Sequence, residues 1–199
     1  MNTGSWIWIT RCALVSAALA SLVGVPGNAA AQANDFPIPG HGSLHLTVPG
    51  GWQAESRSLG KPPSATIHLT PRIGGAFDVQ ITAMWVDAKA AAKTTASMKK
   101  NMQKAARNLL GSAEEKSETL VELKGTECVG WYYSLTDKNP APGEFKYLTQ
   151  GSFAVREVIV AFTILTRSPA GGEVQDALRM FADSTYTVPG ADNPSVRTR

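Results

Sequence analysis

Five basic side chains recur at helical spacing between residues 89 and 107, and no acidic residue stands between Asp87 and Glu114. At about 100° per residue they fall within one sector of about 60°, opposite a stripe that contains Met98 and Met102. These residues are Lys89, Lys93, Lys100, Lys104 and Arg107. A row of one sign is typical of a surface for an acidic protein, an anionic lipid headgroup or a polyanion, although a solvated helix face also carries charge. No aromatic residue lies between the basic residues of this row, which makes the row a poor surface for binding nucleic acid.

Two histidines on alternating segments are candidate metal ligands. His45 lies in "SLHLTV" and His68 in "ATIHLT", each on the polar side of its run. If the two strands were neighbours, the imidazole rings could approach a shared metal ion. The alternative is a pair of ordinary surface histidines. No HExxH or CxxC motif accompanies them, so we expect no metal or other cofactor.

Cys128 is a candidate nucleophile only if a histidine lies beside it. Its neighbours, "TECVGW", contain no nucleophile motif, and alternation places it opposite Val129 and Trp131, which favours a buried structural thiol. The chain also lacks a Ser-His-Asp pattern, a phosphate-binding loop and a dinucleotide motif. The carboxylates Glu114, Glu115 and Glu118 read as solubilising charge. We therefore expect a protein that is not an enzyme.

The first 33 residues resemble an export signal. Arg11 precedes an apolar run from Cys12 to Val25, Pro26-Gly27 interrupts it, and Ala31-Gln32-Ala33 fits the cleavage pattern of a signal peptide. The run is too short for a membrane span of about 20 residues. Cleavage would remove Cys12 and leave Cys128 as the single cysteine, so no internal disulfide is expected. The sequence predicts export to the periplasm or beyond, with no transmembrane segment after cleavage.

The elements that position these residues are strands joined by turns. Segments 43–48, 65–70 and 77–86 alternate apolar and polar residues, and the run from 158 to 165 is apolar on both faces, as in a central strand. Pro49-Gly50-Gly51 interrupts two such runs and is interpreted as a corner of the sheet instead of a ligand-binding loop. The stretch 34–42 is predicted to be a flexible arm, and 187–199 a disordered tail.

Two helices complete the pattern. The first is predicted over 89–110, with Asp87 as its cap and Gly111 after its end. The second is predicted to begin at Ser168-Pro169 and to bury Ala177, Leu178 and Phe181. The order of strands, long helix, strands and terminal helix predicts an α+β fold, with a mainly antiparallel sheet against which both helices pack.

Several stretches resemble PsbP-like proteins. They are "LHLTVPGGW", the long helix after "VQITAMWV", "GWYYSL…YLTQGSFAVREVIVAFTIL" and "DALRMFADST". The resemblance covers residues 43–186 as a single domain and implies an α/β/α sandwich, used without catalysis to bind other proteins. No functional residue of that family transfers to a position here, and the fold alone selects no activity.

The length of 199 residues, 43% hydrophobic and 18% charged content indicate one folded domain, and the net charge of +3 is too small to indicate a nucleic-acid binder. We expect an exported binding or accessory protein that docks a protein partner, with peripheral membrane contact left open. The docking surface would be the basic row, an open sheet edge, or the loop 136–143 with Tyr132. The alternatives are an adaptor or immunity protein for a secreted effector, and a metal- or thiol-dependent enzyme.

Overall fold

The structure is a computed structural model that describes residues 30–169 and 171–189. Ten strands and two helices follow one another in these ranges. Their order is β1 (Gln32–Pro37), β2 (Ser43–Val48), β3 (Trp52–Leu59), β4 (Ser64–Pro71), β5 (Phe77–Trp85), α1 (Ala88–Leu109), β6 (Val121–Lys124), β7 (Cys128–Thr136), β8 (Tyr147–Val155), β9 (Val158–Thr166), α2 (Glu173–Ala182) and β10 (Thr185–Thr187).

The strands form two antiparallel sheets. The larger has seven strands in the order β3-β4-β5-β9-β8-β7-β6, and the smaller has three in the order β1-β2-β10. The predicted α+β class, with a mainly antiparallel sheet and two helices, is therefore confirmed. β9 lies at the middle of the larger sheet, between β5 and β8, which agrees with an apolar run on both of its faces.

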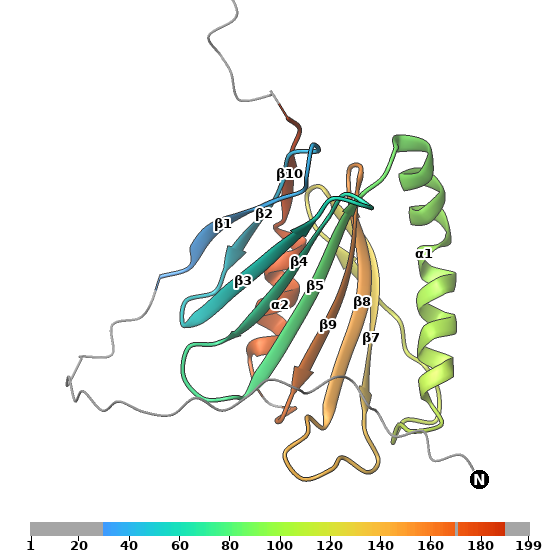
Figure 1. Ribbon diagram of the computed structural model, residues 1–199. Helices are drawn as coiled ribbons and strands as arrows, with labels where there is room; N and C mark the ends of the chain where they lie inside the picture. Colours follow the sequence, from blue (N-terminus) through green and yellow to red (C-terminus); the bar gives the residue numbers. More distant parts are fainter. Residues whose placement is uncertain (1–29, 170, 190–199) are drawn as a thin grey trace, which may run out of the picture.

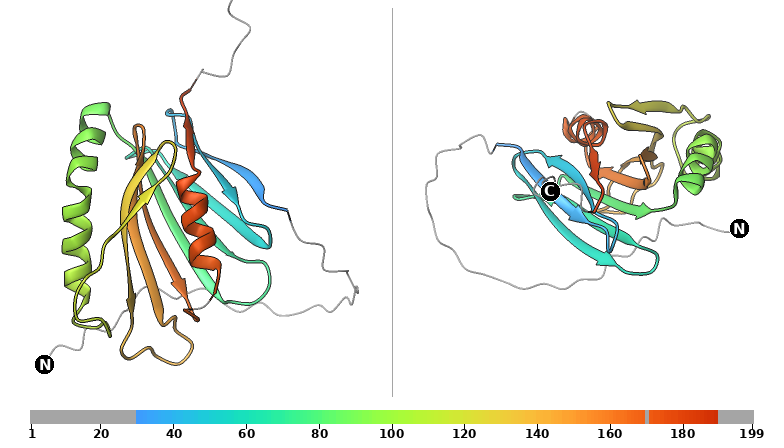
Figure 2. Two further views of the ribbon diagram at one scale, coloured as in Figure 1. Left: turned by 180° about the vertical axis from the view of Figure 1, so that it is seen from behind. Right: turned by 90° about the horizontal axis from the view of Figure 1, so that it is seen from above.

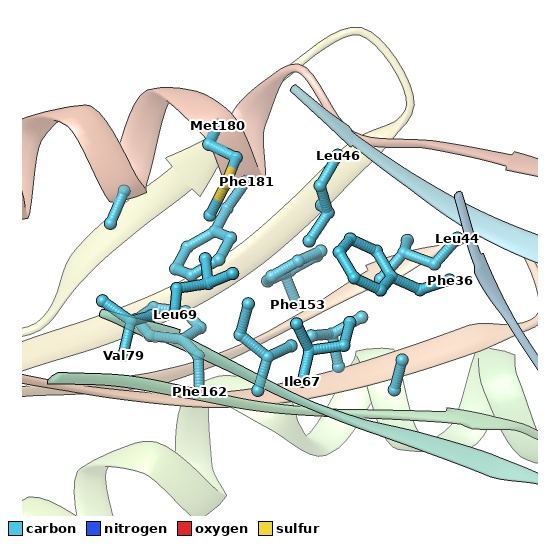
Figure 3. Close-up of a cluster of buried hydrophobic side chains, with 14 of the residues drawn as sticks. Phe36, Leu44, Leu46, Ile67, Leu69, Val79, Phe153, Phe162, Met180 and Phe181 are labelled. Carbon is cyan, nitrogen blue, oxygen red and sulfur yellow. The ribbon is translucent and has the colours of Figure 1, made fainter. Parts of the chain in front are cut away.

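The two helices cover opposite faces of the larger sheet (Figures 1 and 2). Figure 3 shows the main core, where Phe181 of α2 packs on Phe153 and Phe162, with ring centroids 5.4 and 4.5 Å away. The smaller sheet adds Phe36 and Leu44 to the same core. On the other face, Met98 of α1 packs in a separate cluster with Ala154 and Ile159. The larger sheet is thus the middle of three layers.

The prediction of a flexible arm over residues 34–42 is wrong. β1 pairs along its whole length with β2, from Gln32 opposite Val48 to Pro37 opposite Ser43. Phe36 and Ile38 are 4% and 1% exposed, so the folded domain begins before residue 43. The prolines of this stretch suit an edge strand, where a missing N–H leaves no gap in the ladder.

The predicted bounds of the first helix hold to within one residue, but those of the second do not. α2 begins after Gly172 and not at Ser168-Pro169. At the other end, Thr187 belongs to β10, whereas residues 190–199 of the predicted tail lie outside the described ranges, as do residues 1–29 of the predicted signal peptide. Among the described residues, neither helix has the length and apolar character that crossing a membrane requires.

Candidate functional site

α1 forms as the sequence predicts because its residues are strong helix formers and its start is capped. Alanine, lysine, methionine and glutamine fill most of its 22 positions. The Asp87 carboxylate accepts a hydrogen bond of 2.8 Å from the backbone N–H of Ala90, which satisfies one of the free donors of the first turn. Ala91, Met98 and Ala106 are buried on the inner side. This packing fixes which side of α1 faces solvent.

The five predicted basic residues share the solvent side of α1, and all five side chains are exposed. We call this set, Lys89, Lys93, Lys100, Lys104 and Arg107, the basic face. α1 is the outermost element on its side of the molecule, with no other element drawn over it (Figure 1). Within residues 30–169 and 171–189, the four lysines of the basic face form no ion pair. Their charge has no counter-charge inside the described fold.

Arg107 is the exception within the basic face. Its Nε donates a hydrogen bond of 2.6 Å to Oε1 of Glu118, and Gln103 donates a second one of 3.0 Å to the same oxygen. The pKa of Glu118 is lowered by its own backbone N–H, by Arg107 and by Gln103. The interpretation of Glu118 as solubilising charge is therefore wrong, because this carboxylate ties the segment after α1 to the last turn of the helix.

The two neighbouring carboxylates also have partners. Glu114 forms an ion pair with Lys146 at 2.9 Å. Glu115 accepts hydrogen bonds from the backbone N–H of Thr136, at 2.9 Å to Oε2, and from its hydroxyl, at 2.8 Å to Oε1. Burial alone would raise the pKa of Glu115, but these hydrogen bonds outweigh it and the pKa is lowered. Glu115 therefore connects the segment after α1 to β7, Glu114 connects it to the residue before β8, and neither pairs with a lysine of the basic face.

A sixth basic residue of α1, Lys99, lies outside the basic face. The Nζ of Lys99 is 4.2 Å from the centroid of the Trp131 ring on β7, within the range of a cation–π contact. Trp131 also packs on the cluster around Met98. Lys99 therefore helps to hold α1 on the sheet, whereas the lysines of the basic face point away from it.

The structure does not bring His45 and His68 together, so the shared metal site is wrong. β2 and β4 belong to different sheets. His45 Nδ1 lies 2.5 Å from Oδ1 of Asp35, and its Nε2 lies 2.5 Å from Oγ1 of Thr187. His68 Nε2 lies 2.8 Å from Oδ2 of Asp78. In the described part of the chain, no three His, Cys, Asp or Glu side chains are grouped as metal ligands.

Sequence reasoning missed the link that His45 makes. Asp35 on β1, His45 on β2 and Thr187 beside β2 on β10 form one hydrogen-bonded row across the smaller sheet. An alternating pattern shows that these residues share the outer face of their strands, but it does not show that residues 45 and 187 are neighbours. The row joins the first and last strands of the domain, so we assign it to structure.

Cys128 and Tyr132 lie on the core side of the sheet. The Cys128 side chain is 3% exposed, and burial raises the pKa of its thiol to about 12. A thiol of this kind is a poor nucleophile at neutral pH. Tyr132 packs against the main core next to Gly151, where a side chain would meet Phe162 and Tyr132 within 2.7 Å. The packing of Tyr132 against the main core favours a structural role over a surface shared with the loop 136–143.

The segment from Pro49 to Gly51 is a corner, as predicted. It joins β2 of the smaller sheet to β3 of the larger one. The backbone N–H of Trp52 donates to the carbonyl of Pro49 at 3.2 Å, and Gly51 has a φ of +84°, which other L-residues rarely adopt. Trp52 then packs on Phe77, with ring centroids 4.3 Å apart.

No family model matches this sequence, and the search of curated proteins found no match. Among solved structures, the chain is similar to a protein from Bacteroides thetaiotaomicron VPI-5482, with 16% sequence identity and a TM-score of 0.41. The matched region covers 74% of this chain and 46% of that one, so this chain spans less than half of that protein's length. This similarity assigns neither a family nor an activity.

Proposed function

We propose that the protein is an exported, non-enzymatic accessory protein that docks an acidic protein partner through the basic face of α1. The observation that carries this proposal is the set of four exposed lysines, Lys89, Lys93, Lys100 and Lys104, without an ion pair in the described fold. The signal-peptide pattern of residues 1–33 supports export, and the PsbP-like resemblance supports a binding role.

The basic face is unfavourable for the isolated helix. Lys89 and Lys93, and likewise Lys100 and Lys104, are four residues apart on α1. Such pairs of like charge each destabilise a helix by about 0.2–0.5 kcal/mol. Lys89 also lies in the first turn, which has no acidic residue, although the helix dipole favours negative charge there. A partner that supplies carboxylates would remove this repulsion, so the arrangement favours binding to an acidic surface.

The shape of the basic face favours a macromolecule over a small anion. With a rise of about 1.5 Å per residue, the row from Lys89 to Arg107 is about 27 Å long. This length exceeds the screening distance of about 8 Å at physiological salt, so one small anion cannot neutralise the row. The face has no aromatic or large apolar residue that would enter a bilayer. An acidic protein surface matches both properties.

The test is capture from an envelope extract with the full chain and two triple variants. The first variant carries Lys93→Glu, Lys100→Glu and Lys104→Glu. The control carries Lys61→Glu, Lys116→Glu and Lys124→Glu, three exposed lysines outside α1 that give the same change in net charge. We expect the wild type and the control to retain the same acidic protein at low salt, and the α1 variant to lose it.

The retained protein is then purified and its affinity for all three forms is measured at low and moderate salt. We expect the α1 variant to bind at least about tenfold more weakly than the control, with a shallower dependence on salt. Equal loss of binding in both variants would contradict docking by the basic face. Binding of the wild type to vesicles of anionic phospholipid, with no protein partner retained, would contradict docking to a protein and would indicate that the basic face binds a membrane surface.

A further inference from the structure

β3 is an open edge of the larger sheet. It pairs with β4 on one side, and no strand among the described residues pairs with its other side. It is eight residues long, contains no proline, and is exposed from Glu55 to Leu59. The other edge strands are shorter, because β1 has six residues and ends on Pro37, β6 has four and β10 has three. Short strands and prolines protect an edge from pairing, so β3 is the edge best suited to receive another strand.

The hydrogen bonds of the corner determine which backbone groups of β3 face this edge. The backbone N–H of Arg72 donates to the carbonyl of Gly51 at 2.9 Å, so Gly51 bonds toward the β4 side. Along an antiparallel strand, residues alternate between bonding to one neighbour and facing the other side. The odd-numbered residues of β3 therefore bond to β4. Ala54, Ser56 and Ser58 direct their N–H and C=O groups to the open edge.

The corner closes the first end of this edge. The backbone N–H of Trp52 donates to the carbonyl of Pro49 at 3.2 Å. The carbonyl of Trp52 accepts a hydrogen bond of 3.1 Å from Nε of Arg72. Both edge groups of Trp52 are thus occupied, and a partner strand can form its hydrogen bonds along residues 54–58.

The two charged residues of this stretch make the edge complementary to itself. Glu55 and Arg57 are exposed, share one face of β3, and form no ion pair within residues 30–169 and 171–189. In a two-fold antiparallel pair centred on Ser56, Glu55 of each copy lies opposite Arg57 of the other. The same register bonds Ser56 to Ser56 and Ala54 to Ser58, so the free groups of both edges find partners.

The neighbouring registers lack this complementarity. A two-fold axis at Glu55 would place two glutamates directly opposite each other, and an axis at Arg57 would place two arginines opposite each other. Like charges in such positions destabilise a strand pair, whereas opposite charges stabilise it. The charges of β3 therefore select the register centred on Ser56.

We infer that the protein forms a homodimer in which β3 pairs antiparallel with β3 of a second copy about Ser56, so that the two larger sheets become continuous. β3 lies wholly in the chain that remains after the predicted cleavage. It is at the opposite end of the larger sheet from α1 (Figure 1). The dimer leaves the basic face of each copy uncovered, so this inference and the proposed function succeed or fail separately.

The test is analytical ultracentrifugation of the full chain and of charge-reversal variants. We expect the wild type to dimerise with a Kd below about 1 mM, as for a small interface. Glu55→Arg and Arg57→Glu each convert two attractive pairs into two repulsive ones, and each should weaken the dimer at least about tenfold. Glu122→Arg, at an exposed glutamate of β6, makes the same charge change as Glu55→Arg and should leave the Kd unchanged.

A mixture of the two β3 variants tests the register itself. The Glu55→Arg chain has two positive charges at the edge and the Arg57→Glu chain has two negative ones, so each repels itself and complements the other. We expect their equimolar mixture to form a heterodimer with a Kd within about threefold of that of the wild type. Ser56→Pro removes an N–H that faces the edge, keeps the ladder to β4, and should abolish the dimer.

Three results would overturn the inference. A wild type that is monomeric at about 1 mM would leave this edge without a second copy. A dimer that Glu55→Arg and Arg57→Glu do not weaken would place the contact elsewhere on the molecule. A mixture of these two variants that associates no better than either alone would contradict the register centred on Ser56, and this result does not depend on whether Ser56→Pro folds.

Discussion

His45 and His68 are each paired with a different aspartate, and this pairing limits the metal binding and proton transfer that their imidazole rings could perform. Asp35 holds His45 and Asp78 holds His68. His45 also contacts the hydroxyl of Thr187, so both of its ring nitrogens are engaged within the smaller sheet. A histidine with both nitrogens occupied is not free to bind a metal ion or to accept a proton from a substrate. At this scale, the polar residues of the strands connect elements of the fold.

Glu115 provides a test of such a connection through pH. Its pKa in the folded protein is lowered from the ordinary value of 4.5 by the hydrogen bonds from Thr136. A lowered pKa means that the ionised carboxylate stabilises the fold above pH 4.5, and that this contribution is lost as the pH falls through the folded pKa. We expect Glu115→Ala to lower the free energy of unfolding by about 1 kcal/mol at pH 7.

The difference in stability between this variant and the wild type should shrink as the pH falls below 4.5 and through the lowered pKa of Glu115. Urea unfolding at several pH values measures both quantities. Glu122→Ala, at an exposed carboxylate of β6, is the control and should show no such convergence. A stability difference between Glu115→Ala and wild type that stays constant from pH 7 down to the most acidic pH at which the wild type is folded would contradict the assigned role.

At the scale of the element, α1 combines two requirements that conflict. Its inner side must hold the helix on the sheet through Met98 and Ala106. Its outer side carries like charges that oppose helix formation. A helix selected for stability alone would alternate the signs of these charges, so the conflict supports the proposal that α1 carries a binding surface.

Lys100→Glu tests this conflict. The new carboxylate would precede Lys104 by one turn, which converts a repulsive pair into an attractive one in the favourable orientation. We expect the free energy of unfolding to rise by about 0.5 kcal/mol while affinity for the acidic partner falls. Thermal unfolding and partner binding measure the two effects. Lys100→Gln should give about half of each, and a variant that binds the partner as well as wild type would contradict the role of this residue.

β1 is the second informative element, because its place in the core can be tested by stability. Phe36 is 4% exposed, whereas Asp35 beside it is directed to the outer face. We expect Phe36→Ala to lower the free energy of unfolding by about 3 kcal/mol, and Asp35→Ala by less than about 1 kcal/mol. Chemical unfolding of both variants gives the values. If Phe36→Ala were as stable as wild type, the segment would be the flexible arm that its composition predicts.

At the scale of the whole molecule, the periodicity of the sequence predicted the features that depend on which face of a single strand or helix is buried. The alternation over residues 77–85 and the helical spacing over 89–109 report which side is buried, so the strand, the helix and the exposure of the basic face follow from the sequence. Because residues 34–42 are rich in proline and glycine, they were predicted to form a flexible arm. That prediction missed β1 and the two buried apolar residues of this stretch.

Properties that depend on contacts between distant residues could not be predicted in this way. The separation of His45 and His68 follows from the assignment of their strands to two sheets. The contact between Arg107 and Glu118 needs the chain to return along α1. Arg72, which follows β4, donates its backbone N–H to the carbonyl of Gly51 in the corner between the two sheets. A pattern along one strand contains no information on such neighbours.

The most direct test of the central claim is site-specific photo-crosslinking in the living cell, with the full chain in its own compartment. A photoreactive residue replaces Lys93, Lys100 or Lys104 on the basic face, and in matched controls it replaces Lys61, Lys116 or Lys124. We predict that the three α1 positions crosslink to one and the same acidic protein, and that the three control positions do not. Equal crosslinking from all six positions, or none from the basic face, would contradict the claim that α1 is the docking surface.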